Sequence, residues 1–259
     1  MPSQIVVMLD SFVFYLSLAV VLSGLLSLIR PLRFLGIRTR LIGAIVGTIG
    51  LVAAVVTLSL PVRTHRVAVP ATRLDDWMPN WQFGEKHITH VQAPPENVFR
   101  AIHAVRADEI LFFRTLTAIR RCGRPGPESI LDAPEKKPIL DVAINTSFVL
   151  LAEEPPRELV IGTVVLAPSA AHRPQKLEPD LFRKELPAGM ALATMNFEVT
   201  PDEHGGSTVT SETRVYANGA ATIRRFAVYW RIIHPGSDII RRMWLKAIKH
   251  RAEAHVDGT

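Results

Sequence analysis

Two long apolar runs near the N-terminus constrain this chain more than any other feature of its sequence. Ile5–Ile29 is 25 residues long with a single charge, Asp10, and Leu41–Leu60 is 20 residues long with no charge. A helix needs about 20 apolar residues to cross the hydrocarbon core of a bilayer. The first run is too long for a secretory signal peptide, and no basic segment precedes it. The sequence therefore predicts two transmembrane helices, at about 5–29 and 41–60, in an N-terminal hairpin of residues 1–60.

The turn between the two runs predicts how the chain is oriented. Residues 30–40 carry four arginines, and loops rich in lysine and arginine favour the cytoplasmic side of a membrane. The rest of a two-pass membrane protein of this kind would lie on the extracytoplasmic side. Arg63, Arg66 and Arg73 follow the second run and favour the opposite orientation, so both orientations stay open with the extracytoplasmic one preferred.

Small residues would allow the two helices to pack closely. Ser23 and Ser27 are four residues apart in the first run, as are Gly43 and Gly47 in the second. An antiparallel hairpin brings Ser27 level with Gly43, and Ser23 level with Gly47. Small residues at this spacing let helix backbones approach each other, so we expect either this packing or dimerisation through the glycine face.

The chain after a linker of residues 61–81 has the pattern of a soluble α+β domain, residues 82–255. Apolar and polar residues alternate in five runs that are separated by prolines, glycines and polar residues, as in β-strands. The predicted strands are Gln82–Val91, Phe148–Ala152, Glu158–Val165, Met190–Thr200 and Ser207–Ala217. Strand and helix patterns do not alternate along the chain, so an antiparallel sheet is expected rather than a parallel one.

Two helices are predicted between the first two strands. Pro95–Ala104 opens with a proline, which is favoured in the first turn of a helix. Ala107–Arg121 has acidic residues in its first turn and arginines in its last, as the helix dipole favours. Its inward-facing apolar stripe would be Phe112, Phe113, Leu116 and Ile119. Cys122–Pro138 then holds four prolines and two glycines and is predicted to be a long loop, of the kind that forms lids or is disordered.

The segment Asn218–Glu253 is expected to form two helices in series. Apolar residues recur at helical spacing on both sides of a break at His234-Pro235-Gly236, and Ser237 or Asp238 could cap the second helix. Eight basic and two acidic residues leave the segment at +6, equal to the net charge of the chain. The basic residues, expected on the outer faces, are Arg224, Arg225, Arg231, Arg241, Arg242, Lys246, Lys249 and Arg251. Such a surface can be simply solvated, can contact anionic lipid headgroups, or can bind an acidic partner.

This order of elements resembles that of a known superfamily. The run Val91-Gln92-Ala93-Pro94-Pro95-Glu96-Asn97-Val98-Phe99 is similar to the strand-to-helix turn of the START-like, polyketide-cyclase-like helix-grip proteins (SRPBCC). The resemblance covers about Phe83–Glu253. It implies a curved antiparallel sheet that grips a long C-terminal helix, with a cavity between them. Members bind lipids, hormones or polyketides, and some catalyse cyclisation or dehydration. The break at Pro235 and the N-terminal hairpin depart from the usual pattern, and the resemblance transfers no catalytic residue.

Several classes of chemistry have no motif in this sequence. We find no nucleophile elbow, no zinc-protease motif and no phosphate-binding loop. The single cysteine, Cys122, can form neither an intrachain disulfide nor a cysteine metal site, and His87 and His90 point to opposite faces of one strand. We therefore expect no metal and no cofactor. The sequence pI is about 9.8, but the chain contains no nucleic-acid-binding module, so we expect no nucleic-acid partner.

The last predicted hairpin carries a set of polar residues. If its turn centres on His204, Asn196 opposes Glu212 and Thr194 opposes Arg214. One face then carries Thr194, Asn196, Glu198, Thr210, Glu212 and Arg214, and the other carries Met195, Phe197, Val199, Val209 and Val215. Antiparallel sheets commonly have one solvated face and one buried face. The polar face is either solvated or lines a cavity and orients the polar end of a ligand.

These considerations give a set of candidate site residues. The ligand-binding candidates are Phe113, Asn196, Arg214, Tyr216, Phe226 and Trp230. The aromatic members have a simpler interpretation as core residues. His87 and Glu212 are the candidates for acid–base chemistry, although ionisable groups on a strand are common and the catalytic residues stay unknown.

We therefore expect a membrane-tethered protein that binds a small apolar ligand or a lipid in a cavity between the sheet and the C-terminal helix. The loop Cys122–Pro138 would bound this cavity, and the tether would hold it at the membrane. Whether the protein is an enzyme is left open, with binding favoured over catalysis. The alternatives are a cyclase-like or dehydratase-like enzyme on the same fold, and a non-catalytic, membrane-anchored interaction module.

Overall fold

The computed structural model describes residues 2–124, 126–168 and 177–254. The chain divides into two compact units. The helical unit comprises residues up to Val62 together with Ala227–Pro235, and the sheet unit comprises Arg63–Phe226 together with the chain from Gly236 onward.

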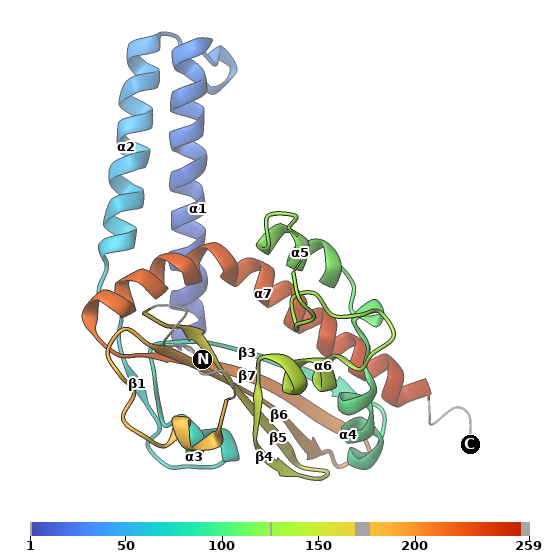
Figure 1. Ribbon diagram of the computed structural model, residues 1–259. Helices are drawn as coiled ribbons and strands as arrows, with labels where there is room; N and C mark the ends of the chain where they lie inside the picture. The colour runs from blue at the N-terminus through green and yellow to red at the C-terminus, as the bar shows by residue number, and fades with distance from the viewer. Residues whose placement is uncertain (1, 125, 169–176, 255–259) are drawn as a thin grey trace. The chain divides into compact units, whose positions relative to one another are not determined.

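The helical unit contains two long apolar helices, α1 (Pro2–Ile29) and α2 (Arg40–Ser59), as the sequence predicts (Figure 1). A turn with a short 3₁₀ helix, η1 (Arg33–Leu35), joins them. The side chain of Thr39 caps α2 by accepting a hydrogen bond from the backbone N–H of Ile42 at 3.2 Å. By length and composition, Phe12–Ile29 and Arg40–Ser59 could each cross a membrane.

The contact between α1 and α2 is made by small residues. A Cβ atom placed on Gly43 would lie 2.7 Å from the Cβ of Ser27, which confirms the predicted pairing of these two positions. The second predicted pair is wrong, because Gly47 faces Gly24 instead of Ser23. Gly24 and Ser23 lie three and four residues before Ser27, so both border the helical face that carries Ser27. Gly24 has no side chain and therefore permits the closer approach of the two helix backbones.

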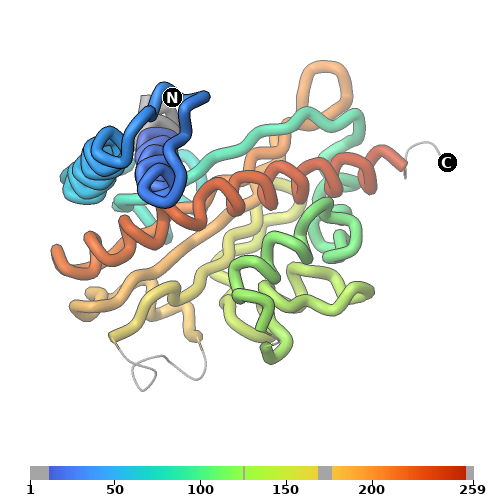
Figure 2. The backbone as a smooth tube through the Cα atoms, turned by 90° about the horizontal axis from the view of Figure 1, so that it is seen from above, coloured from blue at the N-terminus to red at the C-terminus, as the bar shows by residue number. Residues whose placement is uncertain are grey.

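The sheet unit is built on a five-stranded antiparallel sheet with the strand order β3-β7-β6-β5-β4. The strands are β3 (Phe83–Val91), β4 (Val149–Glu154), β5 (Glu158–Leu166), β6 (Ala191–Pro201) and β7 (Ser207–Ala217). All five predicted strands are therefore present, and the antiparallel α+β class is confirmed. The part of α7 that belongs to this unit, residues 236–254, lies across one face of the sheet in a helix-grip arrangement (Figure 2).

Short helices surround the sheet. They are α3 (Arg73–Trp77), α4 (Pro95–Ala104), η2 (Ala107–Glu109), α5 (Phe113–Arg120), α6 (Ile139–Thr146) and η4 (Pro179–Phe182). The prediction for α4 is confirmed at both ends. The predicted continuous helix over Ala107–Arg121 is wrong. Phe112 takes a left-handed conformation with φ 63°, so the chain forms a 3₁₀ turn and then a separate α5.

The predicted inward stripe of the second helix is also wrong at two of its four positions. Phe113 is 3% exposed, whereas Phe112 is 55% exposed and Ile119 is 68% exposed. Because the helix starts only at Phe113, its buried side is the one carrying Phe113 and Thr117. The other apolar side chains therefore point outward.

The C-terminal segment forms one helix, α7 (Ala220–Ala254), and not the two helices that were predicted. Pro235 lies inside it and removes only one backbone donor, while apolar contacts continue on both sides. Ser237 does not cap a new helix, because its hydroxyl donates to Glu85 Oε1 at 2.8 Å. Two arginines expected on the outer face are largely buried: Arg231 is 6% exposed, and the side chain of Arg241 is 14% exposed.

The segment expected to be a linker, residues 61–81, contains secondary structure in the sheet unit. A two-stranded sheet pairs β1 (His65–Arg66) with β2 (Asn80–Trp81), and α3 lies between them in the sequence. Thr72 and Asp75 form a capping box at the start of α3, and Leu74 is fully buried. Helix α3 packs against β5 and β6, on the face opposite α7. The two faces of the main sheet are therefore covered by different helices.

Candidate functional site

The pairing of β6 with β7 determines which face each polar side chain occupies. Asn196 opposes Glu212 and Thr194 opposes Arg214, so the predicted register is confirmed. The apolar set packs with Trp244 of α7 in the main core; the ring centroids of Phe197 and Trp244 are 5.1 Å apart. The polar set therefore faces α3.

The polar face is buried, not solvated. Asn196 is 2% exposed and Arg214 is 6% exposed, because α3 and the chain beside it cover them. Arg214 donates to Asp75 Oδ1 at 2.8 Å, to Glu212 Oε1 at 2.6 Å and to the carbonyl oxygen of Met78 at 3.1 Å. Its guanidinium also lies 4.1 Å from the ring centre of Trp81.

A buried carboxylate connects this network to α3. Glu158 accepts hydrogen bonds from Asn196 Nδ2 at 2.7 Å and from the backbone N–H groups of Arg73 at 2.7 Å and Leu74 at 3.2 Å. Burial acts to raise the pKa of Asp75, but hydrogen bonds from Ala71, Arg214 and Thr72 outweigh it and leave the pKa lowered. These groups use their hydrogen-bonding capacity on protein partners, as expected of a network that holds α3 on the sheet.

A second polar cluster faces α7. Glu85 and His87 of β3 are 5% and 7% exposed, and their cross-strand neighbours on β7 are Thr213 and Ser211. From α7, Ser237 donates to Glu85, and the guanidinium of Arg241 lies 3.6 Å from the same carboxylate.

Some polar atoms of this cluster have no hydrogen-bond partner. Within the part of the chain that the structure describes, these atoms include His87 Nε2, Ser211 Oγ and Thr213 Oγ1. Asp238 Oδ1 lies 3.7 Å from His87 Nε2, beyond hydrogen-bonding distance. Buried polar atoms are normally paired, so unpaired ones mark a place where a water or a ligand group can bind.

Burial lowers the pKa of His87. The neighbouring carboxylates of Glu85 and Asp238 act in the opposite direction, and the guanidinium groups of Arg242 and Arg241 reinforce the lowering. The imidazole is therefore neutral at pH 7, with one ring nitrogen able to accept a proton. It can serve as a hydrogen-bonding group or as a base.

This burial predicts a stability that depends on pH. The unfolded chain protonates His87 near pH 6.5, while the folded chain does so only at lower pH. Unfolded protein then binds more protons as the pH falls below 6.5, so the free energy of unfolding decreases. Each unit of pKa depression corresponds to about 1.4 kcal/mol. We expect urea unfolding at a series of pH values to show that the free energy of unfolding falls below pH 6.5 in the wild type, and falls less in His87→Gln. An equal pH dependence of the free energy of unfolding in the two proteins would contradict this prediction.

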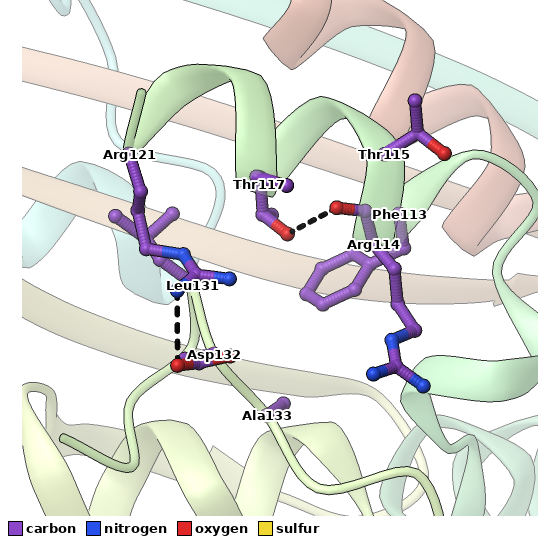
Figure 3. A pocket seen from close by; sticks show the side chains of 9 residues that line it. Phe113, Arg114, Thr115, Thr117, Arg121, Leu131, Asp132 and Ala133 are labelled. Carbon is purple, nitrogen blue, oxygen red and sulfur yellow. Dashed lines mark hydrogen bonds and ion pairs between the residues drawn. The ribbon is translucent and has the colours of Figure 1, made fainter. Parts of the chain in front are cut away.

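A pocket of about 300 Å³ lies elsewhere in the sheet unit, beside α5 (Figure 3). One wall is α5, and the other is the segment Leu131–Ala133 of the loop that follows it. Its lining combines apolar side chains with hydroxyls and charges: Phe113, Arg114, Thr115, Thr117, Ala118, Arg121, Leu131, Asp132 and Ala133. The loop Cys122–Pro138 thus lines a pocket, but this pocket lies between α5 and the loop and is not the predicted cavity between the sheet and the C-terminal helix.

The charged groups at this pocket are held by neighbours. Arg121 donates to Asp132 Oδ2 at 3.0 Å, and Arg114 forms an ion pair with Glu135. The hydroxyl of Thr117 donates to the backbone carbonyl oxygen of Arg114 at 3.2 Å. In the described part of the chain, Arg121 Nε is buried without a hydrogen-bond partner. The arginine therefore has a donor that its protein contacts do not use.

The predicted site residues are dispersed. Phe113 lines the pocket, whereas Asn196 and Arg214 belong to the α3-facing network. Tyr216 packs beside Met78 in a side cluster. Phe226 is buried against Phe83, with ring centroids 4.9 Å apart, and Trp230, in the helical unit, packs on His234 at 5.2 Å.

The two acid–base candidates are separated by the sheet. His87 faces α7, while Glu212 lies on the other face, with its carboxylate paired to Arg214 and 3.6 Å from Lys86 Nζ. Among the described residues, no group of three or more histidine, cysteine or acidic side chains could hold a metal ion. Sequence reasoning missed Thr117, Arg121, Leu131 and Asp132, and the only available signal was their position at the edge of a long loop.

Comparison with known proteins adds little beyond this description. No known family profile matches the sequence, and no curated protein matches it. Among solved structures, protein MLL2253 from Mesorhizobium loti is 14% identical with a TM-score of 0.30. The match covers 65% of this chain and 96% of the Mesorhizobium loti protein. CalU16 from Micromonospora echinospora is 14% identical with a TM-score of 0.25, covering 75% and 94%. Ara h 8.0201 is 9% identical with a TM-score of 0.24, covering 66% and 97%. The α+β fold assignment rests on the strand order and α7 of this chain.

Proposed function

We propose that this protein is a membrane-anchored binding protein for a small amphipathic ligand that carries a hydrogen-bond acceptor. The observation that carries this proposal is the pocket of about 300 Å³ between α5 and Leu131–Ala133. This volume is at the lower end of the range of ligand pockets, which is about 300–1,000 Å³. At about 30 Å³ per water, it corresponds to roughly ten water molecules.

The lining of the pocket sets the chemistry of the ligand. Phe113, Ala118, Leu131 and Ala133 provide apolar surface for a short hydrocarbon chain or a small ring system. Arg121 also lines the pocket, and its guanidinium is a charged hydrogen-bond donor. A carboxylate, carbonyl or phosphate oxygen is the matching acceptor. We therefore favour a small amphipathic molecule over a purely apolar one.

The two apolar helices support a membrane location for this binding. We propose that α1 and α2 span the bilayer and that their arginine-rich turn, residues 30–40, lies in the cytoplasm. The sheet unit would then be extracytoplasmic. A binding domain tethered in this way samples apolar molecules where they are concentrated, in or beside the lipid.

Filling the pocket tests the proposal. We expect Ala133→Phe to occupy the space beside Phe113 and to reduce ligand binding at least about tenfold, which is the effect of losing about 1.4 kcal/mol. The measurement is native mass spectrometry of the full chain, released from detergent micelles after exposure to a membrane lipid extract. The wild type should carry a discrete added mass that is lost on unfolding.

Ala254→Phe is the matched control, because it makes the same change at an exposed position at the end of α7. It should retain the added mass. If wild type and Ala133→Phe carry the same added mass, the ligand lies outside this pocket. If the wild type carries none from any lipid fraction, the binding function itself is wrong.

An enzyme is the second candidate, and the α7-facing cluster is the observation that favours it. His87 is buried with a lowered pKa, lies near two carboxylates, and has a ring nitrogen with no hydrogen-bond partner among the described residues. Such a group can remove a proton from a bound substrate near neutral pH. If the protein is an enzyme, His87→Gln would abolish turnover and leave ligand binding intact. If it is only a binding protein, the wild type itself would show no turnover.

A further inference from the structure

The outer side of α5 exposes apolar residues that the fold does not use. Leu111 is 57% exposed, Phe112 is 55% exposed and Ile119 is 68% exposed. Leu116 and Ile119 are three residues apart on α5 and border one helical face, while Leu111 and Phe112 immediately precede the helix. We call Leu111, Phe112, Leu116 and Ile119 the α5 patch. Single exposed apolar residues are ordinary, but a contiguous group of them usually marks an interaction site.

The backbone presents the first part of this patch. Phe112 has a φ of 63°, in the left-handed region that bulky residues rarely adopt. Such a conformation is unfavourable for a bulky residue and persists only where the surroundings impose it. Here it starts α5 so that Phe113 turns into the core while Phe112 stays in solvent. The exposed aromatic ring is thus a fixed feature of the turn.

The chain on the C-terminal side of the patch is basic, whereas Asp108 and Glu109 precede the patch. Residues 111–124 carry four arginines and no acidic residue. Over residues 111–137, six basic and three acidic side chains leave a net charge of +3. Arg114 is paired with Glu135, and Arg121 with Asp132. Arg120 and Arg124 are exposed on the surface at the C-terminal end of α5.

We propose that the α5 patch inserts into the headgroup region of an anionic lipid bilayer, with Arg120 and Arg124 contacting the headgroups. Apolar side chains bordered by arginines have the character of an interfacial membrane-binding helix. Arginines near an anionic membrane surface are attracted to its headgroups. Two apolar helices in the same chain would hold this surface near a bilayer, so that even a weak contact becomes populated. A neutral or basic protein surface would match the patch less well than anionic lipid does.

This contact gives α5 two roles, and here the inference rests on the proposed function. Phe113, Thr117 and Arg121 line the pocket on one side of α5 (Figure 3). The exposed patch residues do not line it. Insertion of the patch would place the pocket beside lipid. An amphipathic ligand could then pass from the bilayer into the pocket without crossing bulk water.

A fluorescent probe at position 112 tests the contact. The full chain is reconstituted in nanodiscs, in a Cys122→Ser background that removes its single cysteine, and Phe112→Cys is labelled with an environment-sensitive dye. Ile88→Cys is the matched control, because Ile88 is also an apolar residue of the sheet unit and is 57% exposed, but lies on β3. The nanodiscs contain phosphatidylcholine alone or mixed with phosphatidylglycerol, and include a headgroup-region spin-labelled lipid as quencher.

We expect the probe at position 112 to shift to the blue and to lose most of its emission in anionic nanodiscs, but not in neutral ones. The probe at position 88 should keep its emission in both. Replacing Arg120 and Arg124 together by glutamate should restore the emission at position 112. Quenching at both positions would overturn the proposal. A blue shift at position 112 without quenching by lipid would also overturn it, because a protein partner or a second copy of the chain would give that result. So would the absence of any change. The added mass in native mass spectrometry reports ligand binding separately, so its presence or loss does not depend on this result.

Discussion

Replacing Arg214 by alanine is expected to destabilise the sheet unit by about 3–5 kcal/mol, the usual cost of removing one partner of a buried ion pair. The side chains of Arg214 and Asp75 are 7% and 8% exposed, and their closest atoms are 2.8 Å apart. Without the guanidinium, Asp75 keeps a buried negative charge and the carbonyl oxygen of Met78 loses a donor. The loss should appear as a lower midpoint in urea unfolding of the full chain in detergent.

Two further variants separate the ion pair from the packing of the arginine side chain. Arg214→Lys keeps the charge but cannot contact Asp75, Glu212 and Met78 together, so we expect an intermediate loss. In Asp75→Asn/Arg214→Ala, the asparagine removes the unpaired charge, so the double variant should be more stable than Arg214→Ala alone. Equal stability of Arg214→Ala and the wild type would mean that α3 does not depend on this network.

Trp244→Ala is expected to cost a similar amount, about 3–5 kcal/mol, because it removes a large side chain from the core. Trp244 is 1% exposed, and its ring packs against Phe197, which is fully buried on β6. This contact joins α7 to the centre of the sheet. Its loss should lower the unfolding midpoint and weaken the attachment of the C-terminal half of α7, seen as faster amide hydrogen exchange there.

Trp244→Phe is the control for this prediction. Among the described residues, the indole nitrogen of Trp244 has no hydrogen-bond partner, so phenylalanine loses volume but no hydrogen bond. We expect less than half the destabilisation of Trp244→Ala. A loss as large for phenylalanine as for alanine would show that the indole nitrogen has a partner of its own.

The β-strands and α4 could be predicted because their signals are local. The turn around His204 sets the pairing of Asn196 with Glu212, because residues at equal distances from a hairpin turn lie opposite each other on the two strands. The proline at the start of α4 likewise marks its first turn. The small residues in the two apolar runs predicted the contact of Ser27 with Gly43, because close packing depends on residue size.

The use of the two sheet faces could not be predicted in the same way. Alternation shows that Asn196 and Arg214 share a face, but not that α3, more than a hundred residues earlier in the sequence, covers it. Helical periodicity also assigned Phe112 to the core. A single left-handed residue turned it outward, and no sequence pattern marks that conformation in a phenylalanine.

The candidate site was only partly predictable. Phe113 and the loop Cys122–Pro138 were expected at a cavity between the sheet and the C-terminal helix, whereas the pocket that they line lies beside α5. The other lining residues come together through the path of the loop, which brings Leu131 and Asp132 against α5. Loop paths depend on contacts such as that of Arg121 with Asp132, which cannot be read from spacing.

Photo-crosslinking tests the central claim most directly. The full chain, reconstituted in lipid, is exposed to a diazirine-bearing short-chain fatty acid, irradiated and digested, and the modified peptides are identified. The ligand-binding account predicts adducts on Phe113–Arg121 or Leu131–Ala133 that unlabelled fatty acid competes away and that Ala133→Phe abolishes. Adducts confined to α1 and α2, or adducts on the sheet unit that persist in Ala133→Phe, would contradict it.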